Sequence, residues 1–415
     1  MSTLKNRSRR RANAALAAGA ATAALAPFGI VRAQAQKLRV GVLLPRSGVQ
    51  GFIGQSCQIG ADVAPPVIRE LVGVDVELMN ADTETNVDVA RSRAERLIQE
   101  GAQVLVGPFD SGAAIAISQV AEQRGIPFVI NIAAAPQITE QGYKYVFRNF
   151  PTAIELTRNG LSLIGDLFRA TNVAPRTAVF MHVNDTFGTS MQKGISAILP
   201  GLTHLPFRIV ETVSYDPAAR DLSVEVARAK ASNADFVLLV SRLNDAIILR
   251  REMVRQRWNH MGIVSPGSPG MYEDQFFKAL GKLSDHCISN VPWYDPKSKL
   301  TEMVVKQMEK QFPRERLATG HGLNVSYTFE SLLIAADAFK RAGTANPQQL
   351  TDAIRATNIT ERMSVGGPIR FDAKGQVQGN LSACLQNRDG MPRVVLPANV
   401  AEAKPIFPWP DYKRS

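Results

Sequence analysis

A short segment at 107–113, Gly-Pro-Phe-Asp-Ser-Gly-Ala, combines the features of an anion-binding site. It follows the apolar run 104–106, which predicts a buried strand, and it opens the helical pattern 111–124. The first turn of a helix has backbone N–H groups without helical partners, and the helix dipole favours negative charge there. The segment therefore predicts a site for an anion near Ser111. In an alternative that stays open, Asp110 or Ser111 only caps the helix, although Asp110 can cap while Ser111 binds.

Arginine after a strand is a second candidate for anion binding. Arg242 follows the apolar strand pattern 236–240, and a guanidinium there could offer two parallel hydrogen bonds to a carboxylate. Arg46, in the loop after the first strand pattern, has the same potential. The alternative is a surface arginine, which the total of 48 lysines and arginines in this chain favours.

Motifs of common enzyme classes are absent from the sequence. It contains no Gly-x-Ser-x-Gly elbow, P-loop, Gly-x-Gly-x-x-Gly or His-Glu-x-x-His, and its five histidines are scattered. Cys57, Cys287 and Cys384 lie far apart, without a C-x-x-C or a zinc-like spacing. One disulfide and free buried thiols both stay open. We expect no enzymatic activity, no cofactor and no metal site.

The first 35 residues have the pattern of a secretory signal peptide. Arg7 and Arg9–Arg11 precede the small apolar stretch 12–31, and Ala33-Gln34-Ala35 forms an A-x-A cleavage site. We expect cleavage after Ala35 and a periplasmic protein. A retained membrane anchor is the weaker alternative, because the stretch is mostly alanine. The Arg9-Arg10 pair leaves the twin-arginine and Sec export routes both open.

Removal of this segment changes the charge of the chain. The formal charge of +11 falls to +5, because the segment carries six basic residues and no acid. Lysine and arginine are not clustered in the remainder as nucleic-acid recognition requires, so we expect no nucleic-acid partner. No second long apolar run follows that would span a membrane.

The rest of the chain alternates strand and helix patterns. Ordered along the chain, they fall at 38–44, 54–70, 74–79, 86–100, 104–106, 111–124 and 128–130, and again at 177–182, 186–199, 209–215, 222–231, 236–240, 246–257 and 262–265. Strand–helix–strand units at this spacing predict parallel sheets covered on both faces. We expect Pro65-Pro66 to end or kink the first helix. The fold class is α/β, with two doubly wound, Rossmann-like lobes that bind ligands at the carboxyl ends of their strands.

Several segments, in order, resemble type I periplasmic binding proteins of the leucine/isoleucine/valine-binding group. The similar segments are 37–48, 98–108, 125–131, 147–149, 185–188 and 367–375. The resemblance covers essentially the whole chain after the signal. It implies three crossovers, near 148–150, 291–295 and 364–368, and a hinge that closes the lobes on one small ligand. We expect lobe 1 to comprise 36–148 and 292–366, and lobe 2 to comprise 149–291 and 367–415.

The resemblance also implies site residues. Ser111 lies where family members bind the ligand carboxylate with a hydroxyl and nearby amides, and the loop 132–135 carries Ala135 in place of a usual threonine. Phe187 stands where amino-acid binders commonly have tyrosine, and Ile53 where an aromatic residue often stacks on the ligand. The ligand-binding residues we predict are Ser111, Gly112, Ala133, Ala134, Ala135, Phe187, Ile53, Arg242 and Ser268.

The segment 265–272, Ser-Pro-Gly-Ser-Pro-Gly-Met-Tyr, lacks the acid that pairs with a ligand ammonium in amino-acid binders. A buried ammonium without a counter-charge costs several kcal/mol. We therefore expect an ABC importer's solute-binding protein for an aromatic or branched apolar carboxylic acid. Its partners would be this ligand and an inner-membrane permease with its ATPase, and it would be a monomer. A branched-chain or other amino acid binding protein and a sensor domain for small amides are the alternatives.

Overall fold

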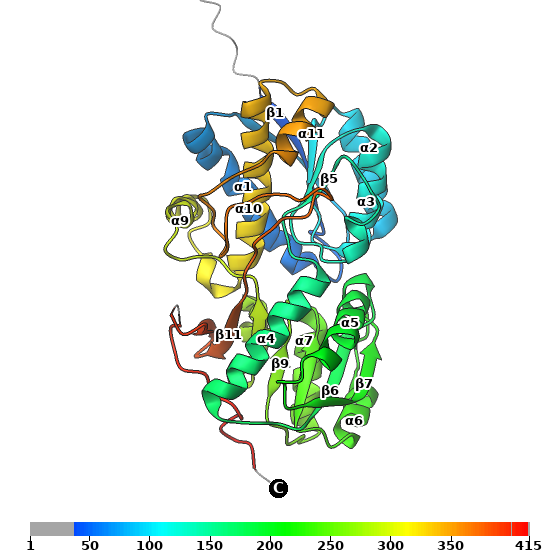
Figure 1. The fold of residues 1–415 in the computed structure, drawn as a ribbon, viewed down its shortest axis with the longest axis vertical. Helices are drawn as coiled ribbons and strands as arrows, with labels where there is room; N and C mark the ends of the chain where they lie inside the picture. Colours follow the sequence, from blue (N-terminus) through cyan, green and yellow to red (C-terminus); the bar gives the residue numbers. More distant parts are fainter. Residues whose placement is uncertain (1–36, 400, 414–415) are drawn as a thin grey trace, which may run out of the picture. The chain divides into compact units, whose positions relative to one another are not determined.

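Two α/β lobes make up the part of the chain that the structure describes, residues 37–399 and 401–413 of a computed structural model (Figure 1). The expected signal peptide lies outside these residues. Each lobe is built on its own sheet, one of five strands and one of seven. The fold class predicted from the sequence is confirmed.

The five-stranded sheet is parallel throughout, in the order β2-β1-β3-β4-β5. Its strands are β1 (Leu38–Leu44), β2 (Val76–Asp82), β3 (Val104–Gly107), β4 (Phe128–Ile130) and β5 (Val146–Arg148). β1 and β3 are almost completely buried, as expected for parallel strands with helices on both faces. Chain order reverses between β1 and β3, so the crevice beyond their carboxyl ends is the expected place for a ligand.

The seven-stranded sheet repeats this order in β7-β6-β8-β9-β10 and then adds an antiparallel hairpin at the β10 edge. Its strands are β6 (Thr177–Val183), β7 (Arg208–Tyr215), β8 (Phe236–Val240), β9 (Ile263–Ser265), β10 (Ile288–Val291), β11 (Ala383–Arg388) and β12 (Met391–Leu396). The switch in chain order lies between β6 and β8. Both lobes therefore place a switch point at the carboxyl ends of their strands.

Helices cover both sheets. Those beside the five-stranded sheet are α1 (Gly51–Val72), α2 (Val87–Gln99), α3 (Ser111–Arg124), α9 (Lys299–Gln311), α10 (Gly322–Ala342) and α11 (Pro347–Arg355). Those beside the seven-stranded sheet are α4 (Ala153–Thr171), α5 (Thr186–Ile198), α6 (Ser223–Ala231), α7 (Leu243–Arg255) and α8 (Asp274–Leu280). Short helical turns occupy Pro136–Ile138, Leu199–Gly201, Gly281–Ser284 and Leu317–His321. Within the described ranges, no helix is long and apolar enough to span a bilayer.

Helix α1 corrects one prediction. It begins at Gly51 and continues through Pro65 and Pro66 to Val72, so the prolines do not end it. Packing against α10 compensates for the missing backbone donors, and Gly60 allows this close approach. A Cβ atom on Gly60 would lie only 2.6 Å from the carbonyl oxygen of Val325 on α10.

The chain crosses between the lobes after β5, after β10 and before β11. The third passage differs in position from the expected 364–368. Gln376 pairs with Arg148 at the β5 edge of the first sheet, and Phe371 pairs with Val377. These pairings favour a third crossover after residue 377, and a first lobe that extends beyond the proposed boundary at 366. Figure 1 shows the same segment beside β5 before the chain descends to β11.

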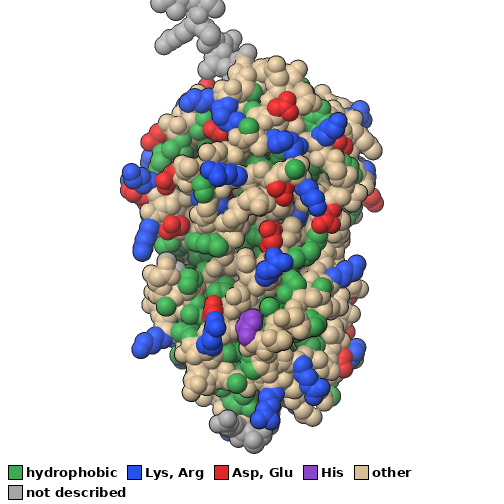
Figure 2. All heavy atoms as spheres, in the orientation of Figure 1, with side chains coloured by type: hydrophobic (Ala, Val, Ile, Leu, Met, Phe, Trp, Pro, Cys, Tyr) green, Lys and Arg blue, Asp and Glu red, His purple; other side chains and the backbone are tan. Residues whose placement is uncertain are grey.

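Charged side chains are mixed over the face in Figure 2, where lysine and arginine alternate with aspartate and glutamate. The three cysteines are buried and free.

Candidate functional site

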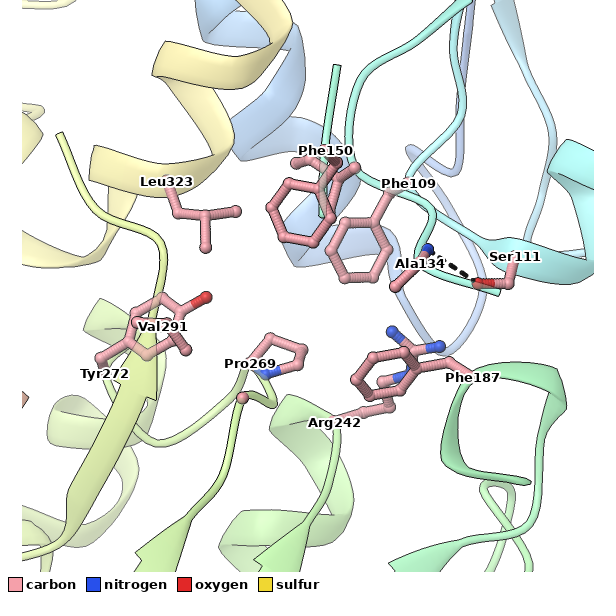
Figure 3. Close-up of a pocket in the computed structure, with 12 residues that line it drawn as sticks. Phe109, Ser111, Ala134, Phe150, Phe187, Arg242, Pro269, Tyr272, Val291 and Leu323 are labelled. Atoms are coloured by element: carbon pink, nitrogen blue, oxygen red, sulfur yellow. Dashed lines mark hydrogen bonds between the residues drawn. The ribbon is translucent and has the colours of Figure 1, made fainter. Parts of the chain in front are cut away.

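A cavity lies between the facing carboxyl ends of the two sheets (Figure 3). The free space inside it is about 20 Å³, which is enough for one water molecule, so its walls must move apart to admit a larger ligand. The residues that line it are Phe109, Ser111, Ile132, Ala134, Phe150, Phe187, Arg242, Gly267, Pro269, Tyr272, Val291 and Leu323. Ser111 and Phe187 lie in the first turns of α3 and α5, Leu323 lies on α10, and the others come from strand ends or the loops after them. Four of the predicted site residues are among them: Ser111, Ala134, Phe187 and Arg242.

Ser111 provides the polar end of the cavity. It is the first residue of α3, it is 1% exposed, and its Oγ accepts hydrogen bonds from the amides of Ala134 at 3.3 Å and Ala135 at 3.4 Å. Both bonds are long, and the hydroxyl hydrogen has no acceptor in the described structure. A carboxylate oxygen could therefore accept from the Ser111 hydroxyl and compete for the two amides.

Asp110 has a separate role. Its carboxylate accepts from the amide of Ala113 at 2.9 Å, which makes it the N-cap of α3. Its other oxygen accepts from the side chain of Gln50 at 3.0 Å. The cap is thus supplied by Asp110, and the hydroxyl of Ser111 is left for the cavity.

The loop 133–135 is held by a fully buried arginine. Nη1 of Arg148 donates to the carbonyls of Ala133 at 3.3 Å and Ala135 at 2.6 Å, while Nη2 donates to Thr139 at 2.7 Å. Nε donates to Gln376 at 2.7 Å. Burial lowers the pKa of Arg148 to about 10, which leaves it charged at neutral pH. Because the loop carbonyls point to Arg148, its amides are free to face Ser111.

Arg242 lies inside the site, so its interpretation as a surface residue is wrong. Its guanidinium donates to one oxygen of Asp185 through Nε at 3.0 Å and Nη2 at 2.8 Å, and Nη2 lies 3.9 Å from Asp110. The ring centroids of Phe187 and Phe109 lie 4.5 and 5.2 Å from the guanidinium carbon. Burial acts to lower the pKa of Arg242, but the two aspartates outweigh it and raise the pKa.

The partners of Arg242 limit what it can do for a ligand. Two of its three nitrogens are committed to Asp185, and only Nη1 has no acceptor among the described residues. Asp185 also caps α5 by accepting from the amide of Gly188 at 2.7 Å. Two of the five N–H groups of Arg242 are thus used by Asp185, the two on Nη1 and one on Nη2 remain, and its charge is already balanced.

The other predicted residues do not line the cavity. Ile53 is a buried core residue of α1 rather than a loop residue, and Ala133 and Ala135 are buried in their loop. Gly112 lies in the first turn of α3, beside Asp110 and Val87. Ser268 is fully buried, and its hydroxyl stabilises the turn after β9 through Ser265 at 2.8 Å and the amide of Ser241 at 3.1 Å.

Sequence reasoning missed most of the apolar walls. The missed lining residues are Phe109, Ile132, Phe150, Gly267, Pro269, Tyr272, Val291 and Leu323. All of them except Leu323 share one sequence signal, a position at or soon after the carboxyl end of a strand. Leu323 has no such signal, because α10 returns to the first lobe from far along the chain.

No acidic side chain is among the residues that line the cavity. Glu273 follows Tyr272 but is fully buried, and one of its oxygens accepts from Asn324 at 3.3 Å. Burial raises the pKa of Glu273 to about 8, so its carboxyl is protonated at neutral pH. Asp110 and Asp185 are occupied by Arg242 and by helix caps. No free negative charge therefore awaits a ligand ammonium, and the described residues contain no acid, cysteine and histidine cluster that could hold a metal.

Two doubly wound lobes with a shared cavity at their switch points define a bilobed solute-binding protein. A family model described as "Periplasmic binding protein" matches residues 37–386. The chain belongs to this family.

Similar proteins cover nearly the whole chain. A Leu/Ile/Val-binding protein homolog 8 from Brucella suis biovar 1 (strain 1330) is 26% identical over 408 residues, which cover 95% of this chain and 96% of the relative. The structure of a leucine binding protein from Thermotoga maritima MSB8 matches with a TM-score of 0.72 at 18% identity, covering 86% of this chain and 97% of that one. A solute binding protein from R. palustris in complex with benzoate matches with a TM-score of 0.72 at 19% identity, covering 89% and 98%.

Proposed function

We propose that this protein is the extracytoplasmic solute-binding component of an ABC importer and that it binds a small carboxylic acid with an aromatic or branched apolar body. One observation carries the proposal. The cavity joins neutral hydrogen-bond donors at Ser111 and Ala134 to walls of aromatic and aliphatic side chains, with no acidic side chain in the lining.

An anion fits the polar end of the cavity because the hydrogen-bond donors there can bind it without an additional positive charge. Ligand oxygens could accept from the Ser111 hydroxyl, the Ala134 amide and the N–H groups of Arg242 that do not bond to Asp185. Hydrogen bonds to a charged acceptor are shorter and about twice as strong as neutral ones, so a carboxylate would replace the long bonds within the protein. An amino acid would bring an ammonium into the same cavity without a partner.

The relatives support both the transport class and the choice between ligands. One structural neighbour is named for leucine and another was solved with benzoate, so this fold accommodates both chemistries. The cavity of this chain favours the second. An inner-membrane permease and its ATPase would be the partners, and mature protein beginning at Gln36 would act in the periplasm.

A thermal-shift screen of aromatic acids, aliphatic acids and branched-chain amino acids tests the ligand class. A ligand at 100 times its Kd adds about 2.7 kcal/mol to the free energy of unfolding, which gives a readable increase in melting temperature. Stabilisation by acids alone supports the proposal. Stabilisation by leucine or isoleucine but not by acids would contradict it.

Hinge closure has its own test. The lining residues are buried in this structure, so a ligand needs an opening of the lobes to enter. Small-angle scattering should show a smaller radius of gyration with a saturating ligand than without it. An unchanged radius would argue against closure of the lobes.

Cleavage after Ala35 has a separate test, N-terminal sequencing of periplasmic protein.

A further inference from the structure

The end of the cavity opposite Ser111 also presents a polar group. Tyr272 follows β9, its side chain is 1% exposed, and its hydroxyl points into the cavity in Figure 3. Its ring packs on Trp293 with centroids 5.4 Å apart and an interplanar angle of 82°, which fixes the ring position. No described residue is hydrogen-bonded to this hydroxyl.

A buried tyrosine hydroxyl usually has a hydrogen-bond partner, because desolvation of an unpaired hydroxyl is costly. The Tyr272 hydroxyl is therefore a polar group at the far end of otherwise apolar walls.

Between the two ends, aromatic and aliphatic side chains form the walls of the cavity. Figure 3 shows Phe109 and Phe150 on one side, Pro269 on the other, and Ser111 and Tyr272 at opposite ends. A planar aromatic body between these walls would extend from the carboxylate donors toward the Tyr272 hydroxyl.

We infer that Tyr272 is a specificity-determining residue and that the ligand is an aromatic acid with a hydroxyl group on the ring, distal to the carboxylate. This inference rests on the proposed function and refines it. The ligand hydroxyl and the Tyr272 hydroxyl form one hydrogen bond, in which either group can donate.

Isothermal titration with matched ligand pairs tests this inference. The pairs are benzoate with 4-hydroxybenzoate and cinnamate with 4-hydroxycinnamate, which differ in length but carry the same added hydroxyl. One net hydrogen bond corresponds to a preference of roughly three- to tenfold for the hydroxylated member of a pair that fits. Tyr272→Phe should abolish this preference, because it removes the hydroxyl and keeps the ring.

Tyr327→Phe is the matched control. Tyr327 is fully buried on α10, its hydroxyl also lacks a partner in the described structure, and it does not line the cavity. This variant should keep the wild-type preference.

The outcomes separate the two proposals. Equal affinities of wild-type protein for both members of each pair, or equal losses for both in Tyr272→Phe, overturn the role of Tyr272 and leave the carboxylate site intact. Failure of all four acids to bind overturns the proposed function, and this inference with it.

Discussion

Replacement of Ser111 by alanine tests the carboxylate site most directly. The Ser111 side chain is 1% exposed, and its long bonds to Ala134 and Ala135 contribute little in the free protein. We expect the substitution to lower the free energy of unfolding of the free protein by at most about 1 kcal/mol. With a carboxylate bound, the loss is larger because a hydrogen bond to a charged group contributes about 1.5–3 kcal/mol.

This difference predicts an increase in Kd of roughly 10- to 150-fold for the acid that gives the largest thermal shift. Isothermal titration measures it. Ser118→Ala is the control, because Ser118 lies on the same helix, is 1% exposed and does not line the cavity. An affinity of Ser111→Ala within twofold of wild type, or an equal loss in Ser118→Ala, would refute the assignment.

Three further predictions concern charge and packing. Arg242→Met should lower the free energy of unfolding by about 1–3 kcal/mol, because it leaves the half-buried carboxylate of Asp185 without its cation; adding Asp185→Asn should restore part of this loss in denaturant titrations. Glu273 binds its proton more tightly in the folded than in the unfolded state, since its pKa rises from 4.5 to about 8. The free energy of unfolding should therefore fall as pH rises toward 8. Glu273→Gln should make the melting temperature less dependent on pH between 6.5 and 8, a range in which ordinary carboxyl groups no longer titrate. An unchanged pH dependence would contradict the buried, protonated state of Glu273. Gly60→Val should destabilise the protein by more than 1 kcal/mol in denaturant titrations, because the added Cβ would lie 2.6 Å from the backbone of Val325. Gly73→Val is the control for backbone strain alone, because a Cβ on Gly73 would have no atom within 4 Å.

Local sequence signals predicted the first lobe well. The apolar run at 38–44 is β1, and the Gly-Pro-Phe-Asp-Ser segment is the strand exit and helix start that its residues indicated. These features depend on neighbours in the chain, namely an uninterrupted apolar strand and a capping aspartate. The helix start and the family resemblance together pointed to Ser111, which lies in the lining of the cavity.

The C-terminal hairpin shows a signal that was present and overlooked. Asp389-Gly390, a typical two-residue turn, joins β11 and β12, and both residues have positive φ angles of 52° and 77°. Pro392 is compatible with its strand because β12 forms the edge of the sheet. The apolar walls are a different case, since Phe150, Tyr272 and Leu323 come together only through packing of the two lobes.

The charge balance of the site explains why an arginine in the cavity does not by itself make an anion receptor. Arg242 lies between Phe109 and Phe187, and its charge is matched by Asp185 and approached by Asp110. A ligand carboxylate that displaced Asp185 would leave that half-buried aspartate without its cation, which offsets part of the gain. Neutral donors at Ser111 and the Ala134 amide carry no such penalty. We therefore expect Arg242 to fix Phe187 and the two aspartates in place, while Ser111 and the backbone of the loop 133–135 distinguish a bound carboxylate from other groups.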